Sequence, residues 1–182
     1  MRKSLELVIG LLVGVALIEI AIPQLGFFWH LAHTDQVVMD GHLFTVPSKY
    51  FLSGSEGRLT FTRFSPVVPL IAERSAIAGP FAKMNMIGIY KHDDGKSFDR
   101  DADYFRLKEW LANEVKQAGL SLESERSLST QLGTAYCFQS NGSQMAEVRC
   151  FLDGSKVSVL FMGEPRFAND VYQVVSGVTR VN

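Results

Sequence analysis

The sequence predicts an α+β domain, an antiparallel sheet flanked by helices, preceded by one N-terminal transmembrane helix. Three observations predict this class. Short apolar runs are separated by tight-turn residues, as antiparallel strands are. Two segments in the C-terminal half carry a one-sided apolar stripe at helical spacing, which is typical of helices packed on a sheet. An almost uncharged apolar segment opens the chain.

The opening segment has the length and composition of a membrane anchor. Residues 7–18 include no charged side chain, and Glu19 is the one charge within 7–29. A membrane helix needs roughly 20 apolar residues, so the longer range suffices if Glu19 lies near the headgroup layer. The aromatic triplet at 27–29 suits the interface between lipid and water.

The distribution of basic residues predicts which side of the membrane the domain occupies. Arg2 and Lys3 precede the apolar segment, and the next basic residue is Lys49. The positive-inside rule then places the N-terminus in the cytoplasm and the rest of the chain outside it, in the periplasm or the extracellular space. We therefore expect a signal-anchor and juxtamembrane segment at 1–33 and an extracytoplasmic domain at 34–182.

Two alternatives compete with the anchor. A cleaved signal peptide would have the same charged start and apolar middle, but a convincing cleavage site with small residues is missing. A helix buried in the core of a soluble protein would also tolerate Glu19 and Pro23.

The first strands are predicted from their turns. Asp40-Gly41 favours a tight hairpin between 37–39 and 42–46, because Asp-Gly suits a type I′ turn. A second antiparallel pair is expected at 50–52 and 58–64. The proline-containing residues 64–83 predict an excursion with a short helix at 70–76, followed by a strand at 84–90 and a polar loop at 91–100.

The two helices of the domain are predicted from periodicity. The first begins at Asp101 or Asp103, either of which can cap it, and ends at Gly119. The second starts near Pro165. Strands are expected between them, at 134–139, 147–152 and 157–162. The apolar stripes comprise Tyr104, Leu107, Leu111, Val115 and Ala118 in the first helix and Phe167, Val171, Val174, Val175 and Val178 in the second.

The two cysteines, Cys137 and Cys150, are a candidate disulfide. An Asn-Gly sequence at 141–142 predicts a hairpin between them. A two-residue turn there would pair Cys137 with Ala146, whereas a longer loop centred on Ser143 and Gln144 would place the two sulfurs opposite each other. The alternative is two independent, small core residues.

The order of these elements resembles a known family. The run Gly-His-Leu-Phe-Thr-Val-Pro-Ser-Lys-Tyr at 41–50 is similar to the opening of Mog1/PsbP-like domains, in which an extended aromatic segment meets a proline and then an aromatic residue. A strand, a long helix, an antiparallel meander and a Phe-led final helix follow in the same order, over about 37–181. The resemblance implies a sandwich of sheet and helices with a non-catalytic accessory role. The excursion at 64–83 departs from the family pattern.

Charge and motifs exclude several functions. The chain has 18 Lys+Arg and 19 Asp+Glu, a net charge of −1, without a run of basic residues for nucleic acid. Neither a nucleophile-elbow motif nor a phosphate-binding glycine loop occurs, so we expect no cofactor. Residues 92–103 are rich in Asp but lack the spacing of a calcium loop.

One cluster could bind a metal ion. His30, His33, Asp35 and His42 are of the types that coordinate zinc, and two of the histidines are three residues apart. The alternative is a solvated linker next to the membrane, with His42 on a strand.

We therefore expect a membrane-anchored accessory protein of the cell envelope that binds a protein partner there. The candidate contact surfaces are the loop at 91–100 and the apolar residues of the excursion, Val67, Val68, Leu70 and Ile71. The alternative function is a membrane-tethered, metal-dependent hydrolase that uses the four residues of the histidine cluster.

Overall fold

The computed structural model describes residues 2–21, 24–54, 58–66, 82–92, 95–142 and 145–181. The helices in this part of the chain are α1 (Arg2–Ala21), α2 (Leu25–Ala32), α3 (Arg100–Gln117) and α4 (Ala168–Ser176), the last preceded by a 3₁₀ turn at Pro165–Phe167. The strands are β1 (Gln36–Met39), β2 (His42–Thr45), β3 (Phe51–Gly54), β4 (Arg58–Pro66), β5 (Ala82–Lys91), β6 (Ser121–Thr130), β7 (Gly133–Asn141), β8 (Ala146–Leu152), β9 (Val157–Gly163) and β10 (Thr179–Arg180).

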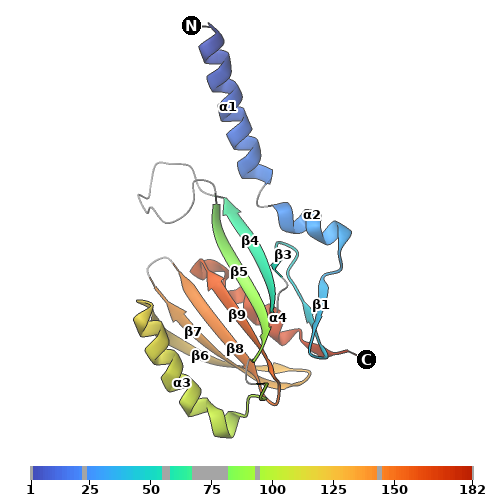
Figure 1. Ribbon diagram of the computed structural model, residues 1–182, viewed down its shortest axis with the longest axis vertical. Helices are drawn as coiled ribbons and strands as arrows, with labels where there is room; N and C mark the ends of the chain where they lie inside the picture. The colour runs from blue at the N-terminus through green and yellow to red at the C-terminus, as the bar shows by residue number, and fades with distance from the viewer. Residues whose placement is uncertain are drawn as a thin grey trace.

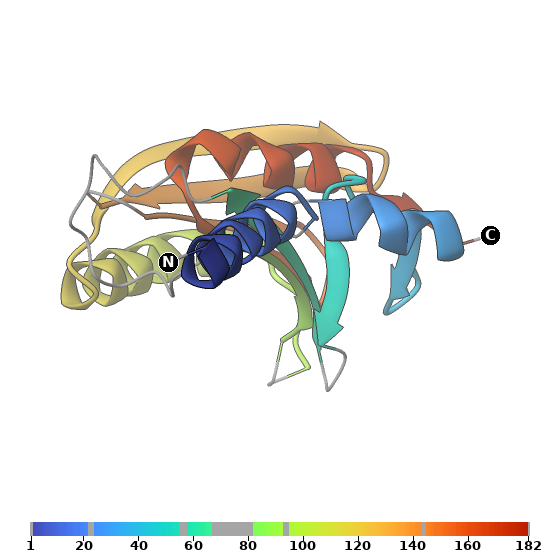
Figure 2. The ribbon, with the colours of Figure 1, turned by 90° about the horizontal axis from the view of Figure 1, so that it is seen from above.

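The described strands form two antiparallel sheets, which confirms the predicted α+β class. The larger sheet has seven strands in the order β3-β4-β5-β9-β8-β7-β6, and the smaller has three in the order β1-β2-β10. Helices α3 and α4 lie on opposite faces of the large sheet (Figure 2). The strands predicted from 37 to 64, at 84–90 and from 134 to 162 all form, and the expected antiparallel pairs β1–β2, β3–β4, β7–β8 and β8–β9 are present.

The main core lies between the large sheet and α4. Val171, Val174, Val175 and Val178 are all fully buried there, as their helical spacing predicted. Alternate residues of the central strands complete it: Ile87 and Ile89 of β5, Val148 and Cys150 of β8, and Val157, Val159 and Phe161 of β9. Alternation along each strand therefore separates this core from the face under α3.

A second, aromatic core lies between α3 and the opposite face of the sheet. Leu111 and Val115 of the predicted stripe are buried, and Tyr104 and Leu107 pack beside them. The predicted capping residues, Asp101 and Asp103, were wrong. The helix is capped by Asp99, whose carboxylate accepts hydrogen bonds from the first free amides of the helix. Its extended backbone suits a capping residue.

The β1–β2 hairpin has the predicted tight turn. Met39 pairs with His42, and both Asp40 (φ 49°) and Gly41 (φ 76°) adopt the left-handed conformation that a type I′ turn requires. Asp tolerates this conformation better than most non-glycine residues.

Strand β6 was not predicted. Ser127 and Ser129 lie in this ten-residue strand, which forms one edge of the large sheet and pairs with β7. Only alternate residues, such as Leu122 and Leu128, are partly buried, so the strand has a weak apolar signal. Strand β10, which adds to β2, was also missed.

Most of the excursion predicted at 64–83 lies outside the described residues. This holds for the short helix at 70–76 and for the proposed contact residues Val67, Val68, Leu70 and Ile71. The ends of the excursion lie in β4 and β5, which pair with each other up to Pro66 and Ala82.

Helices α1 and α2 differ in their relation to the domain. Helix α1 projects beyond the end of the sheet, and α2 runs across its direction, between α1 and the domain (Figure 1). Helix α2 contacts β3 and β4. Among the residues described, no helix satisfies the length and apolarity criteria for a membrane crossing.

Candidate functional site

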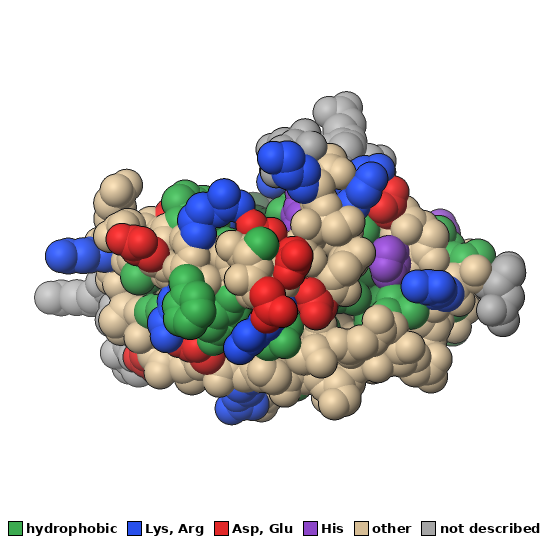
Figure 3. All heavy atoms as spheres, turned by 90° about the horizontal axis from the view of Figure 1, so that it is seen from below, with side chains coloured by type: hydrophobic (Ala, Val, Ile, Leu, Met, Phe, Trp, Pro, Cys, Tyr) green, Lys and Arg blue, Asp and Glu red, His purple; other side chains and the backbone are tan. Residues whose placement is uncertain are grey.

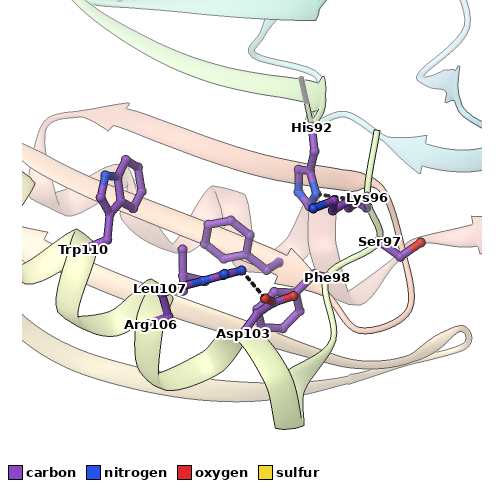
Figure 4. Close-up of a pocket in the computed structure, with 9 residues that line it drawn as sticks. His92, Lys96, Ser97, Phe98, Asp103, Arg106, Leu107 and Trp110 are labelled. Carbon is purple, nitrogen blue, oxygen red and sulfur yellow. Dashed lines mark hydrogen bonds and ion pairs between the residues drawn. The ribbon is translucent and has the colours of Figure 1, made fainter. Parts of the chain in front are cut away.

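A pocket opens between α3, the loop after β5 and strand β8 (Figure 4). Its volume of about 480 Å³ is typical of small-ligand sites, which span roughly 300–1,000 Å³. Aromatic and aliphatic side chains provide much of its surface, and polar side chains complete the lining. The lining residues are His92, Lys96, Ser97, Phe98, Asp103, Arg106, Leu107, Trp110 and Phe151.

Helix α3 contributes one wall of the pocket. Asp103, Arg106, Leu107 and Trp110 are spaced at i, i+3, i+4 and i+7, so they share one side of the helix. Leu107 also packs against the aromatic core. Trp110, which flanks the apolar stripe of the helix, remains 49% exposed. The pocket therefore borders the core and keeps one large aromatic side chain accessible.

Phe98 and Phe151 provide the buried apolar part of the lining. Their ring centroids lie 5.5 Å apart, and Phe98 also lies 6.0 Å from the ring of Tyr136. Distances of this size are typical of stabilising aromatic pairs. These rings are fixed by the same cluster that packs α3 on the sheet.

The loop wall of the pocket is fixed to the turn between β8 and β9. The amide of Phe98 donates to the carbonyl of Ser155 at 2.8 Å, and the amide of Gly154 donates to the carbonyl of Phe98 at 2.8 Å. The amide of Arg100 donates to the Asp153 carboxylate at 3.1 Å. Because these bonds hold the loop from both sides, this wall is preformed.

His92 is held in one orientation at the side of the pocket. Its Nδ1 lies 3.0 Å from the carbonyl oxygen of Lys96, and its Nε2 is hydrogen-bonded to the hydroxyl of the fully buried Ser158. A carbonyl oxygen only accepts, so Nδ1 donates; in the neutral ring Nε2 then accepts from Ser158. Both ring nitrogens thus have hydrogen-bond partners within the protein, and the ring forms part of the pocket wall.

The charges around the pocket are paired. The guanidinium of Arg106 forms an ion pair with Asp103, whose other oxygen accepts from the amide of Asp99. Beside the pocket, Arg149 lies 5.2 Å from the ring centroid of Trp110 and makes two hydrogen bonds to Glu114, at 3.0 and 3.1 Å. Burial opposes the charge of Arg149, but Glu147 and Glu114 outweigh that effect and raise its pKa.

The predicted metal cluster does not assemble among the described residues. His30 Nδ1 lies 2.6 Å from Asp35 Oδ1, so one pair forms. His33 instead stacks on Trp29, and its Nδ1 lies 2.9 Å from the Trp29 carbonyl oxygen. His42 Nδ1 lies 2.8 Å from the Asp40 carbonyl oxygen. In the described part of the chain, no three or more His, Cys, Asp or Glu side chains are placed together so that they could hold a metal ion.

The predicted disulfide is present. Cys137 and Cys150 are directly opposite each other in the β7–β8 register, and their sulfurs are bonded. Asn141 pairs with Ala146, so the connection is the longer loop and not a two-residue turn. The bridge therefore joins two neighbouring strands within the main core.

A second polar cluster fixes α4 to the sheet. Asp170 Oδ2 accepts hydrogen bonds from Tyr50 Oη and Arg63 Nη1, both at 3.0 Å. The Arg63 guanidinium also lies 3.9 Å from the ring centroid of Phe167. Burial and the neighbouring Asp170 raise the pKa of Tyr50 well above its usual value. These groups satisfy one another, so their arrangement explains the position of α4 and offers no reactive group.

The sequence indicated part of the pocket. The loop at 91–100 was a candidate contact surface because of its length, and residues 92 and 96–98 of it line the pocket. Trp110, Phe151 and Arg106 were missed as site residues. The available signal was Trp110, a large aromatic residue beside the predicted buried stripe of its helix.

Comparisons with known proteins do not add a relative to this description. A scan against protein-family models finds no family that matches the chain. A search of curated proteins also finds no match.

Proposed function

We propose that the chain is a membrane-anchored binding protein, with α1 in the lipid bilayer and the α+β domain on the non-cytoplasmic side. The exposed apolar surface of α1 is the observation that carries the proposal. Its described aliphatic side chains are between 50% and 72% exposed: Leu7, Val8, Ile9, Leu11, Val13 and Leu17. At about 100° per residue these positions fall on every side of the helix. A helix that is apolar all round needs an apolar surrounding.

The dimensions of α1 match a bilayer. Its 20 residues at about 1.5 Å each give a length of about 30 Å, comparable to a bilayer's hydrocarbon core, although Arg2, Lys3 and Glu6 occupy its first two turns and belong at the headgroup layer. The chain continues with apolar residues at 20–22, beyond Glu19. A carboxylate near a helix end reaches the headgroups or becomes protonated, at a cost of roughly 1–3 kcal/mol, which the apolar residues of the same helix offset.

Two further observations support the orientation. Arg2 and Lys3 precede the apolar helix, as the positive-inside rule requires for a cytoplasmic N-terminus. A disulfide such as that between Cys137 and Cys150 is typical of proteins in an oxidising compartment, such as the periplasm or the extracellular space.

The pocket under α3 supports a binding role for the domain. It is preformed, apolar in its depth and charged at its edge, which are properties of ligand sites. The resemblance of the element order to Mog1/PsbP-like domains implies the same kind of accessory role. We propose a protein component of the cell envelope as the partner, with its contacting side chain or segment seated beside Trp110.

Extraction of isolated membranes tests the anchor. The full chain is expected to remain in the pellet after washing with alkaline carbonate, and Leu11→Arg/Val13→Arg is expected to be released, since each arginine costs about 3 kcal/mol in the bilayer centre. Val38→Arg is the control, because Val38 is an exposed strand residue of the domain. A parent chain that stays in solution without detergent would contradict the proposal.

Co-purification tests the binding role. After mild solubilisation of native membranes, Trp110→Ala is expected to lose a partner that the parent chain retains. Phe105→Ala is the matched control: Phe105 is 76% exposed on the same helix but does not line the pocket. Equal recovery of the partner with both variants would exclude the pocket as its binding site.

A further inference from the structure

We infer that α2 lies in the lipid–water interface and holds the domain at a fixed orientation on the membrane. The inference rests on the proposed insertion of α1. It concerns a different surface, the outward side of α2, and follows from how α2 is attached to the domain.

The inward side of α2 is tightly attached to the sheet. Gly26 is buried, and a Cβ atom at this position would lie 2.2 Å from the carbonyl carbon and oxygen of Lys49. The Trp29 ring packs on the main core, 6.3 Å from the ring of Phe61. His30 Nε2 donates to the carbonyl oxygen of Tyr50 at 2.8 Å. Because backbone approaches backbone at Gly26, α2 is part of the domain's rigid framework.

The outward side of α2 is apolar. Phe27, Phe28 and Leu31 are 53%, 59% and 70% exposed, and they lie within about 100° of one another around the helix. The helix sequence, Leu-Gly-Phe-Phe-Trp-His-Leu-Ala, places its one polar side chain, His30, on the inward side. Large aromatic and aliphatic residues on one side of a helix suit insertion to the depth of the headgroups and the first acyl carbons.

The position of α2 identifies lipid as the occupant of this surface. Only residues 22–24 separate the end of α1 from the start of α2, so α2 begins where a bilayer crossing by α1 would end. In Figure 1, α2 runs across the direction of α1, with the domain on the far side from α1. If α1 crosses the bilayer, this arrangement places α2 along the membrane surface with Phe27, Phe28 and Leu31 at the lipid boundary.

The opposite end of the molecule is then directed away from the membrane. Viewed from that end, the surface carries acidic and basic side chains side by side (Figure 3). The pocket lies in this region, near the start of α3 and the loop at 95–98. The attachment of α2 therefore presents the pocket to the aqueous compartment and not to lipid.

Photocrosslinking in proteoliposomes tests this inference with the full chain. The photoreactive residue p-benzoylphenylalanine replaces Phe28, Leu11 or Phe105 in separate samples, and the vesicles contain radiolabelled phosphatidylcholine and phosphatidylglycerol. Position 28 and position 11 are expected to form lipid adducts. Position 105, on the exposed side of α3, is expected to show none, since the domain's far end stands off the membrane.

Three other outcomes would each contradict part of this account. Lipid adducts at position 11 without adducts at position 28 overturn the interfacial placement of α2 and leave the anchor intact. Absence of lipid adducts at both positions overturns the anchor itself. A crosslink from position 28 to a second copy of the chain assigns this surface to self-association and contradicts the inference.

Discussion

At the scale of single residues, the covalent bond between Cys137 and Cys150 is the strongest local constraint in the domain. It links β7 to β8 where the two residues are direct partners, and both sulfur-bearing side chains are buried in the main core. The bridge closes a short loop of the chain, with a sequence separation of 13. Its effect is expected mainly on the unfolded state, whose freedom it restricts.

Removal of this bridge should lower the stability of the domain measurably. For a loop of this size the loss in the free energy of unfolding is about 3 kcal/mol. Chemical denaturation of the parent chain and of Cys137→Ala/Cys150→Ala measures it. Reductant is expected to destabilise the parent and leave the variant unchanged; a parent chain of equal stability with and without reductant would show that the bridge contributes nothing.

The ion pair that joins α3 to β6 gives a pH-dependent contribution. Lys108 and then Tyr104 donate hydrogen bonds to Glu125, and they lower the pKa of this carboxyl below its usual 4.5. A lowered pKa in the folded state stabilises the protein above pH 4.5. This contribution disappears as the pH falls through the lowered pKa.

Glu125→Gln should therefore weaken the domain at neutral pH only. Because Glu125 and Lys108 are both partly exposed, the expected loss is a few tenths to about 1 kcal/mol. Denaturation curves of parent and variant at pH 7 should differ by this amount and converge in acid. Glu109→Gln on the exposed side of α3 serves as the control. A difference that persists unchanged below the lowered pKa would refute the electrostatic origin.

At the scale of elements, the attachment of α2 depends on one glycine. Gly26→Val would bring a side chain into the backbone of Lys49, so α2 must move or detach. We expect a loss of about 1–3 kcal/mol, the usual cost of overpacking, together with increased hydrogen exchange of the α2 amides. Gly14→Val in α1 is the control, since a Cβ there meets no atom within 4 Å. Equal protection of α2 in both variants would argue against a rigid attachment.

Elements with a strong local pattern could be predicted from the sequence. The valine stripe of α4 reflects burial against one face of the sheet, and the apolar runs of β8 and β9 reflect central strands buried on both faces; all three elements form as expected. The Asp40-Gly41 turn was also predicted, because its residues tolerate the required backbone conformation. Strand β6 was not, since an edge strand rich in Ser and Glu buries few side chains.

The candidate site was harder to predict than the fold. The pocket is formed by α3, a loop and β8, which are brought together only by the packing of the aromatic core. Residues such as Phe151 read in the sequence as ordinary core residues. The metal cluster was wrong for the opposite reason: four residues close in sequence are divided between α2 and the β1–β2 hairpin. His30 contacts Asp35 and the Tyr50 carbonyl, whereas His33 and His42 each bond a nearby backbone carbonyl instead.

At the scale of the whole molecule, its two ends have different surfaces. One end carries α1 and the outward side of α2, which expose aliphatic and aromatic side chains. The other carries charged side chains of both signs and the pocket. An exposed apolar surface of this extent favours an apolar environment, which lipid around α1 would provide under the proposed function. This difference between the two ends is the basis of the proposed anchoring and of the proposed orientation of the domain.

A pair of reporter fusions after residue 182 tests the central claim most directly. Alkaline phosphatase becomes active in a bacterial host only after export, because it needs disulfides, whereas green fluorescent protein exported by the same route stays dark. The account predicts an active phosphatase fusion and a dark fluorescent fusion, both in the membrane fraction. An inactive phosphatase together with a bright fluorescent fusion would place the domain in the cytoplasm and contradict the account.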